Sequence, residues 1–484
     1  MTGSSNSFKR NFIIFISLAI IFLFKLIPAP TGLPQAGMEV LGIFIGCLIL
    51  WLTISIDWPS FLCIGLLGLM PMLGFNNVLA SSFGNSTFAF LMFTFICTYA
   101  LSETPFLRRC ALFFITSPIA KKGSWHFVIL FFFSVIFVGS FISPTVLFVI
   151  FLPILEEIYN VLKLKKGDKI AEMLMMGLAF CTSISSGMTP IAHVFSLMAM
   201  GYYKAATGRS IDYASYMAFA VPVGLISLIF MILIFKLIYR PDMSYIQNID
   251  ISSLKADNKP MDHKEKSILT IFAIVVGLWI IPGLIKPIFP SIAAKIDFYG
   301  TAMPPLFGAI ALSVLTFEGK PLLNFKNAMS KGVPWGSLIM AAATLTFGTA
   351  MTNEKIGLTK YLSNSLGPAV SNMAPWLLVL LFTLWAAVQT NLSSNMVTVT
   401  TVCTIGIPIV LSTNGAVNTA AVASIIGMMS SYAFATPPAM PHIAIAGSSG
   451  WAHASQLLKY GTLLMIITVI ITVIIGYPIA SALM

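Results

Sequence analysis

The sequence predicts an all-α polytopic membrane protein, with about eleven transmembrane helices and two re-entrant hairpins arranged as two inverted-topology repeats. Two observations support this prediction. The 484 residues are 58% hydrophobic and only 9% charged, too few polar groups to cover a water-soluble protein of this size. In addition, landmarks in the first half of the chain recur in the same order in the second half.

Apolar runs of about the length that a helix needs to cross a bilayer recur along the whole chain. Lys9 and Arg10 precede the first run, as they would in a secretory signal, but the run is too long and no small-residue cleavage motif follows. We therefore expect this run to be retained as a span. The clearest runs are 11–28, 38–57, 58–75, 214–239, 266–287, 301–318 and 458–483.

The distribution of lysine and arginine predicts the orientation in the cell (plasma or inner) membrane. With a cytoplasmic N-terminus, 20 of the 27 lysines and arginines fall on the cytoplasmic side, in agreement with the positive-inside rule. The net charge of +11 therefore reflects topology and does not indicate a nucleic-acid partner. An odd number of spans places the C-terminus outside.

The polar stretch 241–265 divides the chain into halves and is expected to be a cytoplasmic linker. Residues 1–37 would form an N-terminal tail and the first span. The first inverted repeat would occupy 38–240 and the second 266–484. Each repeat is expected to contain one hairpin, at 124–163 and 373–412, and one broken helix, at 168–203 and 416–450.

Three pairs of landmarks indicate the internal duplication. They recur at offsets that differ by only four residues, and five spans per half make the second copy enter the membrane from the opposite side. Inverted repeats of this kind place substrate near the midplane on discontinuous helices. The pairs are Glu103 and Glu354, 251 residues apart, Ser143 and Ser394, also 251 apart, and Thr189 and Thr436, 247 apart.

Each half contains two interruptions of an apolar helix. One is a hairpin tip, and the other is a break rich in Gly, Ser, Thr and Pro, at 182–190 or 430–438. Irregular backbone persists at membrane depth only where it is buried in protein or lines a wet cavity, because lipid cannot satisfy its N–H and C=O groups. A proline kink or a small-residue packing contact would explain any single break, but four in matching positions are expected to converge.

The breaks carry no Asp, Glu, Lys or Arg, which narrows the function. A proton-coupled carrier or an intramembrane enzyme would need carboxylates or a metal motif there, and a channel would need a ring of charge or a shared filter. Helix N-termini instead offer free N–H groups and partial positive charge, which suit a small carboxylate-bearing anion. Helix C-termini and hydroxyls would equally suit Na⁺.

The side chains at the tips and breaks are therefore the candidate binding residues, and no certain metal site or cofactor is expected. Packing roles are the simpler explanation for the two histidines, and exchange that is constant between about pH 5.5 and 7.5 would exclude a charge role. The candidate substrate-binding residues are Ser143, Pro144, Thr145, Ser394, Asn395, Met396, Thr189, Pro190, Thr436 and Pro437. The candidate positions for a cation, or for a positive charge that replaces it, are Ser183, Ser186, Gly187, Ser430, Ser431, Ala435, His193 and His442.

These motifs resemble those of the divalent anion:sodium symporter (DASS, INDY-like) family, whose members carry dicarboxylates, citrate and sulfate. The resemblance extends from about residue 38 to residue 484. The first tip has Pro144 where the family has asparagine, and the second has Met396 where the family has threonine. The asparagine that follows the prolines of both breaks in the family is absent from TPIA at 189–192 and TPPA at 436–439.

The departure at Pro144 matters because proline offers neither a carboxamide nor an N–H. The resemblance therefore implies that the sodium site at the first hairpin tip is weakened. It favours the family's sodium-independent exchangers. The expected function is secondary active antiport of C4–C5 dicarboxylates (succinate, malate, fumarate, 2-oxoglutarate) by an elevator-type mechanism in a homodimer. A sodium-coupled di- or tricarboxylate or sulfate symporter of the same fold is the alternative.

Overall fold

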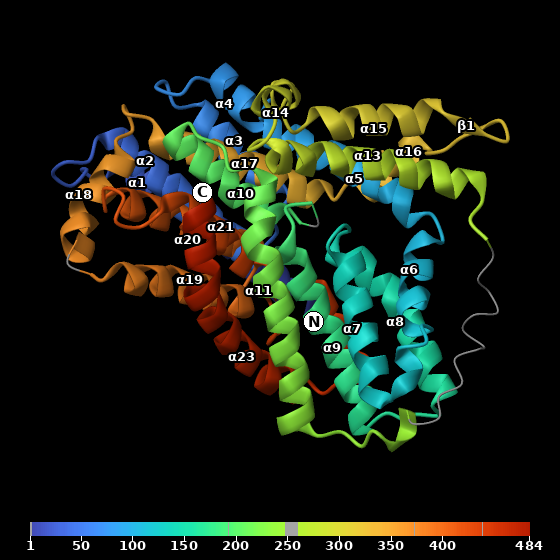
Figure 1. Ribbon diagram of the computed structural model, residues 1–484. Helices are drawn as coiled ribbons and strands as arrows, with labels where there is room; N and C mark the ends of the chain where they lie inside the picture. Colours follow the sequence, from blue (N-terminus) through green and yellow to red (C-terminus); the bar gives the residue numbers. More distant parts are fainter. Residues whose placement is uncertain (1, 192, 247–259, 372, 438) are drawn as a thin grey trace.

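The computed structural model describes residues 2–191, 193–246, 260–371, 373–437 and 439–484. Helices dominate these residues, as the sequence predicts (Figure 1). The two strands in the described part, β1 (Thr316–Phe317) and β2 (Lys320–Pro321), form a small hairpin. The protein is thus an all-α polytopic membrane protein, with only this short strand pair besides helices and loops in the described residues.

The helices of the first half end near residue 240, and those of the second half begin near residue 263. The first set is α1 (Thr2–Leu26), α2 (Gln35–Thr53), α3 (Trp58–Gly68), α4 (Phe75–Ser82), α5 (Ser86–Ser102), α6 (Phe106–Ile115), α7 (Ser124–Gly139), α8 (Pro144–Val161), α9 (Lys169–Met188), α10 (Val194–Thr207) and α11 (Tyr213–Leu233). The second set is α13 (His263–Ile285), α14 (Pro290–Asp297), α15 (Met303–Val314), α16 (Phe325–Asn327), the π-helical turn η4 (Ala328–Gly332), α17 (Trp335–Thr352), α18 (Leu358–Ser371), α19 (Pro375–Leu392), α20 (Asn395–Leu411), α21 (Thr419–Met429), α22 (Pro441–Ser448), α23 (Ala454–Ile471) and α24 (Tyr477–Leu483).

Fewer helices than expected are individually long enough to cross a membrane. In the described residues seven pass by length and composition, or nine if the bent pairs α4–α5 and α16–α17 each count as one span. The runs 58–75 and 301–318 contain helices of only 11 and 12 residues, since α3 ends at Gly68, shortly before Pro71, and the β1–β2 hairpin follows α15. The figure of about eleven spans stays a prediction.

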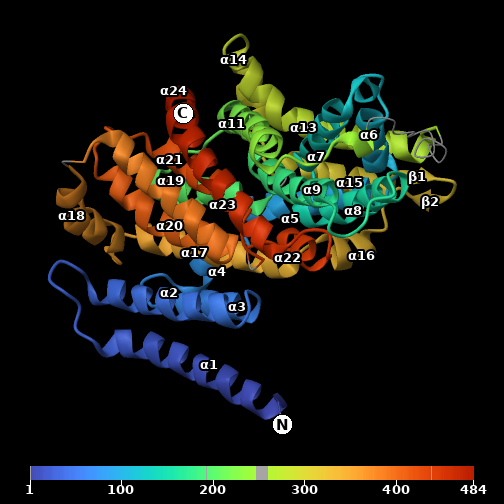
Figure 2. The ribbon, with the colours of Figure 1, turned by 90° about the horizontal axis from the view of Figure 1, so that it is seen from below.

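The two halves lie around α11 (Figure 1). Helices α7, α8 and α9 lie on one side of α11, and α19, α20 and α21 lie on the other. Helix α11 packs against both α9 and α23, which belong to different halves. Helix α1 packs on α2 and lies at the edge of the molecule, with α2 and α3 between it and the rest (Figure 2).

Helix ends lie at each of the four interruptions. Helices α7 and α8 are separated by residues 140–143, and α19 and α20 by residues 393–394. Residues 189–193 separate α9 from α10, and residues 430–440 separate α21 from α22. The inverted relation of the halves and the repeat boundaries remain predictions.

The second half begins slightly earlier than expected. Helix α13 starts at His263, inside the predicted linker 241–265, whose residues 247–259 lie outside the described part of the chain. The Asp262 carboxylate caps this helix by accepting a hydrogen bond from the Glu265 N–H at 2.7 Å. Three residues of the predicted linker therefore belong to α13.

A buried ion pair connects α13 to the first half. Arg109 on α6 donates from Nε and Nη2 to the two carboxylate oxygens of Glu265, at 2.9 and 3.0 Å. The Glu265 side chain is only 3% exposed, whereas Arg108 and Glu157 form a 3.0 Å pair that is about 40% exposed on each side. A planar bidentate pair at low exposure is the stronger restraint.

We expect Glu265→Ala to destabilise the protein by about 3 kcal/mol, because it leaves the Arg109 guanidinium without its carboxylate in a partly buried place. The melting temperature of the detergent-purified protein measures this effect. Glu157→Ala is the matched control and should cost less than about 1 kcal/mol, since its pair is solvated. Equal shifts for the two variants would contradict the structural role of the Arg109–Glu265 pair.

Candidate functional site

Both hairpin tips place a serine at the N-cap of the second helix. Ser143 caps α8 with φ −63° and ψ 144°, and Ser394 caps α20 with φ −71° and ψ 132°. Neither hydroxyl makes the capping hydrogen bond that such serines usually make. Neither has any other hydrogen-bond partner recorded in the described residues. Both hydroxyls are therefore available to a ligand.

The first turns of α8 and α20 also present unpaired backbone donors. The first intrahelical bonds run from the Leu147 N–H to the Ser143 C=O and from the Thr398 N–H to the Ser394 C=O, each 2.9 Å long. The N–H groups before them have no partner within the helix. Pro144 has no N–H, so the first tip offers two such donors and the second offers three.

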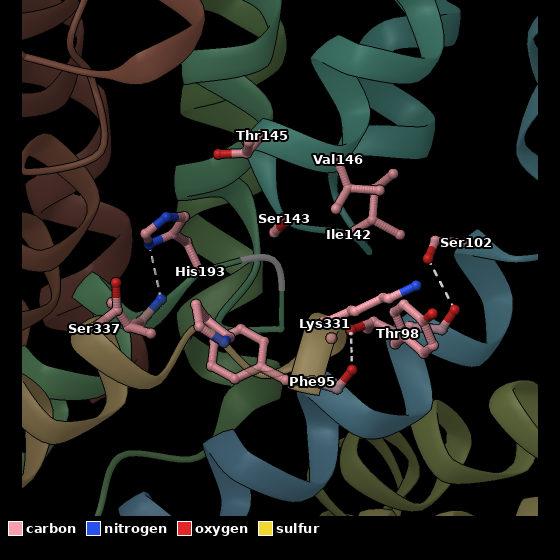
Figure 3. A pocket seen from close by; sticks show the side chains of 14 residues that line it. Phe95, Thr98, Ser102, Ile142, Ser143, Thr145, Val146, His193, Lys331 and Ser337 are labelled. Carbon is pink, nitrogen blue, oxygen red and sulfur yellow. Dashed lines mark hydrogen bonds between the residues drawn. The ribbon is translucent and has the colours of Figure 1, made fainter. Parts of the chain in front are cut away.

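The first tip opens into a cavity of about 350 Å³ (Figure 3). Four segments line it: α5, the first tip, the start of α10 and the η4–α17 junction. Its polar side chains come from all four segments. They are Thr98, Tyr99, Ser102, Ser143, Thr145, His193, Lys331 and Ser337.

His193 is the N-cap of α10 and faces this cavity. Its Nδ1 accepts a hydrogen bond from the Val194 N–H at 2.9 Å, and its ring stacks on Phe195 with centroids 4.0 Å apart. A neutral imidazole whose Nδ1 accepts carries its proton on Nε2. His193 can therefore donate a hydrogen bond from Nε2.

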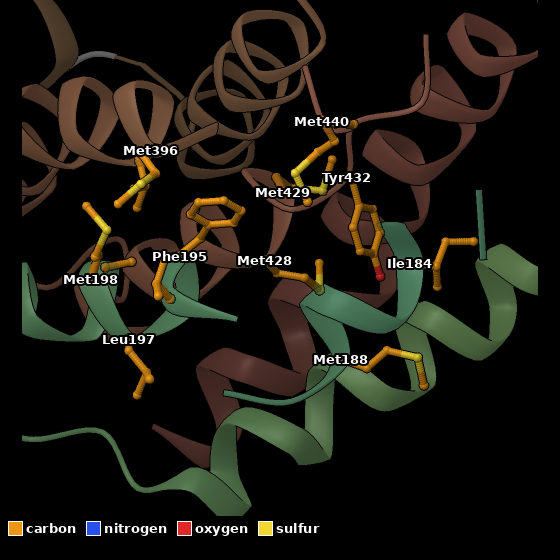
Figure 4. Close-up of a cluster of buried hydrophobic side chains, with 14 of the residues drawn as sticks. Ile184, Met188, Phe195, Leu197, Met198, Met396, Met428, Met429, Tyr432 and Met440 are labelled. Carbon is orange, nitrogen blue, oxygen red and sulfur yellow. The ribbon is translucent and has the colours of Figure 1, made fainter. Parts of the chain in front are cut away.

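The second tip lies in a methionine-rich core and is not part of the cavity lining. Met396 is 5% exposed and lies near Phe195 and Met198 in the cluster of Figure 4, which also contains Met188, Met428, Met429 and Met440. Asn395 is 2% exposed, and neither its Oδ1 nor its Nδ2 has a partner in the described residues. An unpaired buried carboxamide is costly, which makes this position a candidate ligand contact.

The threonine of each Thr-Pro break is bonded to the hairpin of its own half. The Thr189 hydroxyl donates to the Ser140 C=O, and the Thr436 hydroxyl donates to the Asn391 C=O. Ser140 and Asn391 each lie three residues before the tip serine and are 251 residues apart. The same contact thus occurs in both halves, and its two acceptors share the 251-residue offset of the tip serines.

Asn391 makes further contacts for which the first half has no equivalent. Its Nδ2 donates to the Tyr432 C=O at 2.9 Å, and its Oδ1 accepts from the N–H groups of Phe434 and Ala435 at 2.7 and 2.8 Å. The Ser140 side chain has one recorded hydrogen bond in the described residues, from its hydroxyl to the Ile136 C=O of its own helix. Accordingly α9 ends one residue before Thr189, whereas α21 ends seven residues before Thr436.

A buried contact also joins the two broken helices. Ser183 on α9 donates to the Ala433 C=O at 2.5 Å, so it must accept the hydrogen bond from His442 Nε2, 2.8 Å away. His442 is fully buried, and its Nδ1 has no partner in the described residues. A second proton on His442 would have no acceptor there, and the charge role considered for this residue stays untested.

Residues 8–484 match the family model described as the sodium:sulfate symporter transmembrane region. The chain belongs to the sodium:sulfate symporter family. This agrees with the divalent anion:sodium symporter membership predicted from the hairpin and Thr-Pro motifs. As a member of this family the protein is a multi-pass membrane transporter and not an enzyme.

Similar proteins support the assignment at lower identity. The sodium-dependent dicarboxylate transporter SdcS of Staphylococcus saprophyticus is 24% identical over 473 residues, which covers 93% of this chain and 87% of that protein. SdcS of Staphylococcus aureus is 25% identical over 474 residues, with the same coverage. Two solved structures share the fold at 12% identity. The Alcanivorax borkumensis YdaH transporter has a TM-score of 0.55 over 93% of this chain and 98% of that one, and Neisseria gonorrhoeae MtrF has 0.52 over 96% and 94%.

The structure places the candidate residues of this sodium:sulfate symporter family member in several distinct settings. Ser143, Thr145 and His193 share the cavity. Ser394, Asn395 and Met396 form the second tip, while Thr189 and Thr436 secure the hairpins. Ser183 and His442 join the two broken helices. Of the other candidates, Pro144 follows the first tip serine and Pro190 and Pro437 follow the break threonines, and a last set is buried beside the breaks: Ser186, Gly187, Ser430, Ser431 and Ala435.

Packing accounts for several of these buried positions. Ser186, Ser430 and Ser431 each donate to a carbonyl of their own helix. A Cβ on Gly187 would lie 2.7 Å from the Tyr432 ring, so glycine is needed where α9 passes the second break. Sequence reasoning missed Asn391 and Lys331. Asn391, three residues before the tip serine Ser394, received no role, and Lys331 entered only as one of the 20 cytoplasmic lysines and arginines.

We expect Asn391→Ala to lower stability by about 3 kcal/mol, because it removes the partners of three buried backbone groups. Transport should fall as well, since the 432–435 segment loses its anchor. Melting temperature and solute uptake by reconstituted protein measure the two effects. Ser140→Ala is the matched control in the first half and should change little. Similar losses in both variants would show that the carboxamide does not hold the segment.

Proposed function

We propose that this protein is a secondary active transporter of C4–C5 dicarboxylates that works as an anion exchanger. The supporting observation is the pair of matching helix N-termini whose cap serines, Ser143 and Ser394, keep free hydroxyls. Helix N-termini bind carboxylates through unpaired N–H groups and partial positive charge. The dicarboxylate substrates named for the SdcS relatives support the same substrate class.

The cavity supplies the donors that a carboxylate needs. Ser143 can donate from its hydroxyl, and the N–H groups of Thr145 and Val146 point out of the first turn of α8. His193 adds an Nε2 donor from the opposite segment. Hydrogen bonds from these groups to an ionised carboxylate are charge-assisted and therefore stronger than neutral ones.

Pro144 is the basis for proposing exchange and not sodium coupling. A sodium ion needs several oxygen ligands, and proline at this place contributes no side-chain oxygen. The hydroxyl of Ser183, one of the candidates on α9, already donates to the Ala433 C=O and accepts from His442. In an exchanger the empty carrier does not change between its inward-facing and outward-facing states. The bound dicarboxylate itself permits this conformational change.

Sodium-coupled symport is the second candidate. The sodium dependence named for both SdcS relatives favours it. The buried Asn395 carboxamide, unpaired in the described residues, also favours it, because its oxygen can bind Na⁺ just as its nitrogen can donate to an anion. Sulfate or tricarboxylate transport belongs to the same alternative.

We also propose an elevator-type movement of both hairpins and both broken helices within a homodimer. Hydrogen bonds join the four segments in series, from the first hairpin to the first broken helix, then to the second broken helix and the second hairpin. A unit bonded in this way would move as one body. The proposed orientation in the cell membrane has a cytoplasmic N-terminus and an external C-terminus.

Uptake of labelled succinate into proteoliposomes tests the proposed function. We expect uptake only when the vesicles contain unlabelled dicarboxylate, with no dependence on a sodium gradient. Uptake into empty vesicles that requires external sodium would establish the symport alternative. Absence of uptake under both conditions would exclude dicarboxylate transport.

We expect Ser143→Ala to raise the succinate KM roughly tenfold or more, because it removes one charge-assisted hydrogen bond. The same proteoliposome assay measures this change. Ser134→Ala on the same hairpin is the control, since the Ser134 hydroxyl is buried and donates to the Phe131 C=O. An unchanged KM for Ser143→Ala would remove this residue from the substrate site.

A further inference from the structure

We propose that Lys331 provides the positive charge that selects dianions over monoanions in the cavity at the first hairpin tip. The proposal rests on the proposed function, because it concerns the same substrate. It adds a residue from outside the four interruptions. The recognition chemistry is a salt bridge between the Lys331 ammonium and the second carboxylate of the substrate.

Lys331 reaches the cavity from the π-helical turn η4, which precedes α17. Figure 3 shows its side chain extending into the cavity, between the first tip at Ile142 and Ser143 and the α5 residues Thr98 and Ser102. Ser143 and His193 line the same cavity from other segments. A ligand that contacts the tip with one carboxylate would have the ammonium within the reach of its other end.

Two contacts hold η4 in this position. A Cβ on Gly332 would lie 2.6 Å from Tyr99 Cβ, so only glycine allows η4 to pack this closely on α5. The Trp335 Nε1–H donates to the Met329 C=O at 2.8 Å and closes the turn. Lys331 therefore projects from a defined segment and not from a free loop.

Among the residues that the structure describes, no carboxylate forms an ion pair with Lys331. The ion pairs recorded in the described residues are Arg108–Glu157 and Arg109–Glu265, and the cavity lining contains no Asp or Glu. Glu103, the nearest carboxylate in sequence to α5, lines a neighbouring cavity instead. A cavity with hydroxyls, N–H donors and one unpaired ammonium is suited to an anion that carries more than one charge.

The neighbouring cavity extends the basic surface. It measures about 320 Å³, shares Tyr99 with the first cavity and is lined by Lys264 and Lys320 together with Glu103. Lysines that line consecutive cavities raise the local concentration of anions. Of these three lysines, Lys331 is the one that lines the cavity at the first hairpin tip, and it is therefore placed to contact the bound substrate.

Binding of succinate and butyrate to the purified protein tests the proposal, since these acids share a four-carbon chain but differ by one carboxylate. We expect Lys331→Gln to weaken succinate binding by roughly tenfold to a hundredfold, because a charge-assisted bond is lost. Butyrate binding should change less than threefold, and Lys331→Arg should retain most of the succinate affinity. Lys326→Gln is the matched control, because Lys326 is exposed and lines neither cavity.

Succinate affinity in Lys331→Gln equal to that of Lys326→Gln would overturn the proposal, as would equal losses for succinate and butyrate. A wild-type protein that binds no dicarboxylate would instead overturn the proposed function. If Lys331→Gln does not fold, amine acetylation of the wild-type protein gives the answer by mass spectrometry. Succinate should slow the acetylation of Lys331 and leave Lys326 unchanged, and equal rates at both lysines would contradict the proposal.

Discussion

The structure depends on satisfying backbone groups where helices break inside an apolar protein. Lipid offers no partners, so each broken end must be bonded to the protein or to a ligand. Thr189 and Thr436 meet this need by bonding each break to the hairpin of its own half. The first N–H groups and the serine hydroxyls of the two tips have no recorded partner in the described residues, and these are the groups that an anion can use.

The same constraint explains why the two halves differ although their motifs match. The Asn391 carboxamide binds three backbone groups of the 432–435 segment, so this segment can stay non-helical while buried. Ser140 is too short for that role, and α9 stays helical up to Met188. The helix then brings Ser183 to Ala433 and His442, which joins the halves through a buried polar contact.

Ionised side chains do not lie where these hydrogen bonds are made. The breaks contain no ionised side chain, since a full charge buried there would be costly. Lys331 is exposed, lines the cavity and has no ion-pair partner in the described residues. Donors at the tip and the Lys331 ammonium would divide recognition between hydrogen bonding and charge. The soft, adaptable methionines around Phe195 fill the core beside Met396 of the second tip.

Much of this could be read from the sequence, because hydropathy, proline and small polar residues act locally. The composition determined the all-α membrane fold, and Pro144 with Ser143 determined where α8 begins. Tertiary structure alone decided which groups meet. The contacts of Asn391 with 432–435 and of Ser183 with His442 join residues about 40 and 259 positions apart. Lys331 reaches the first tip from the other half, and no local pattern specifies such a meeting because it depends on how whole helices pack.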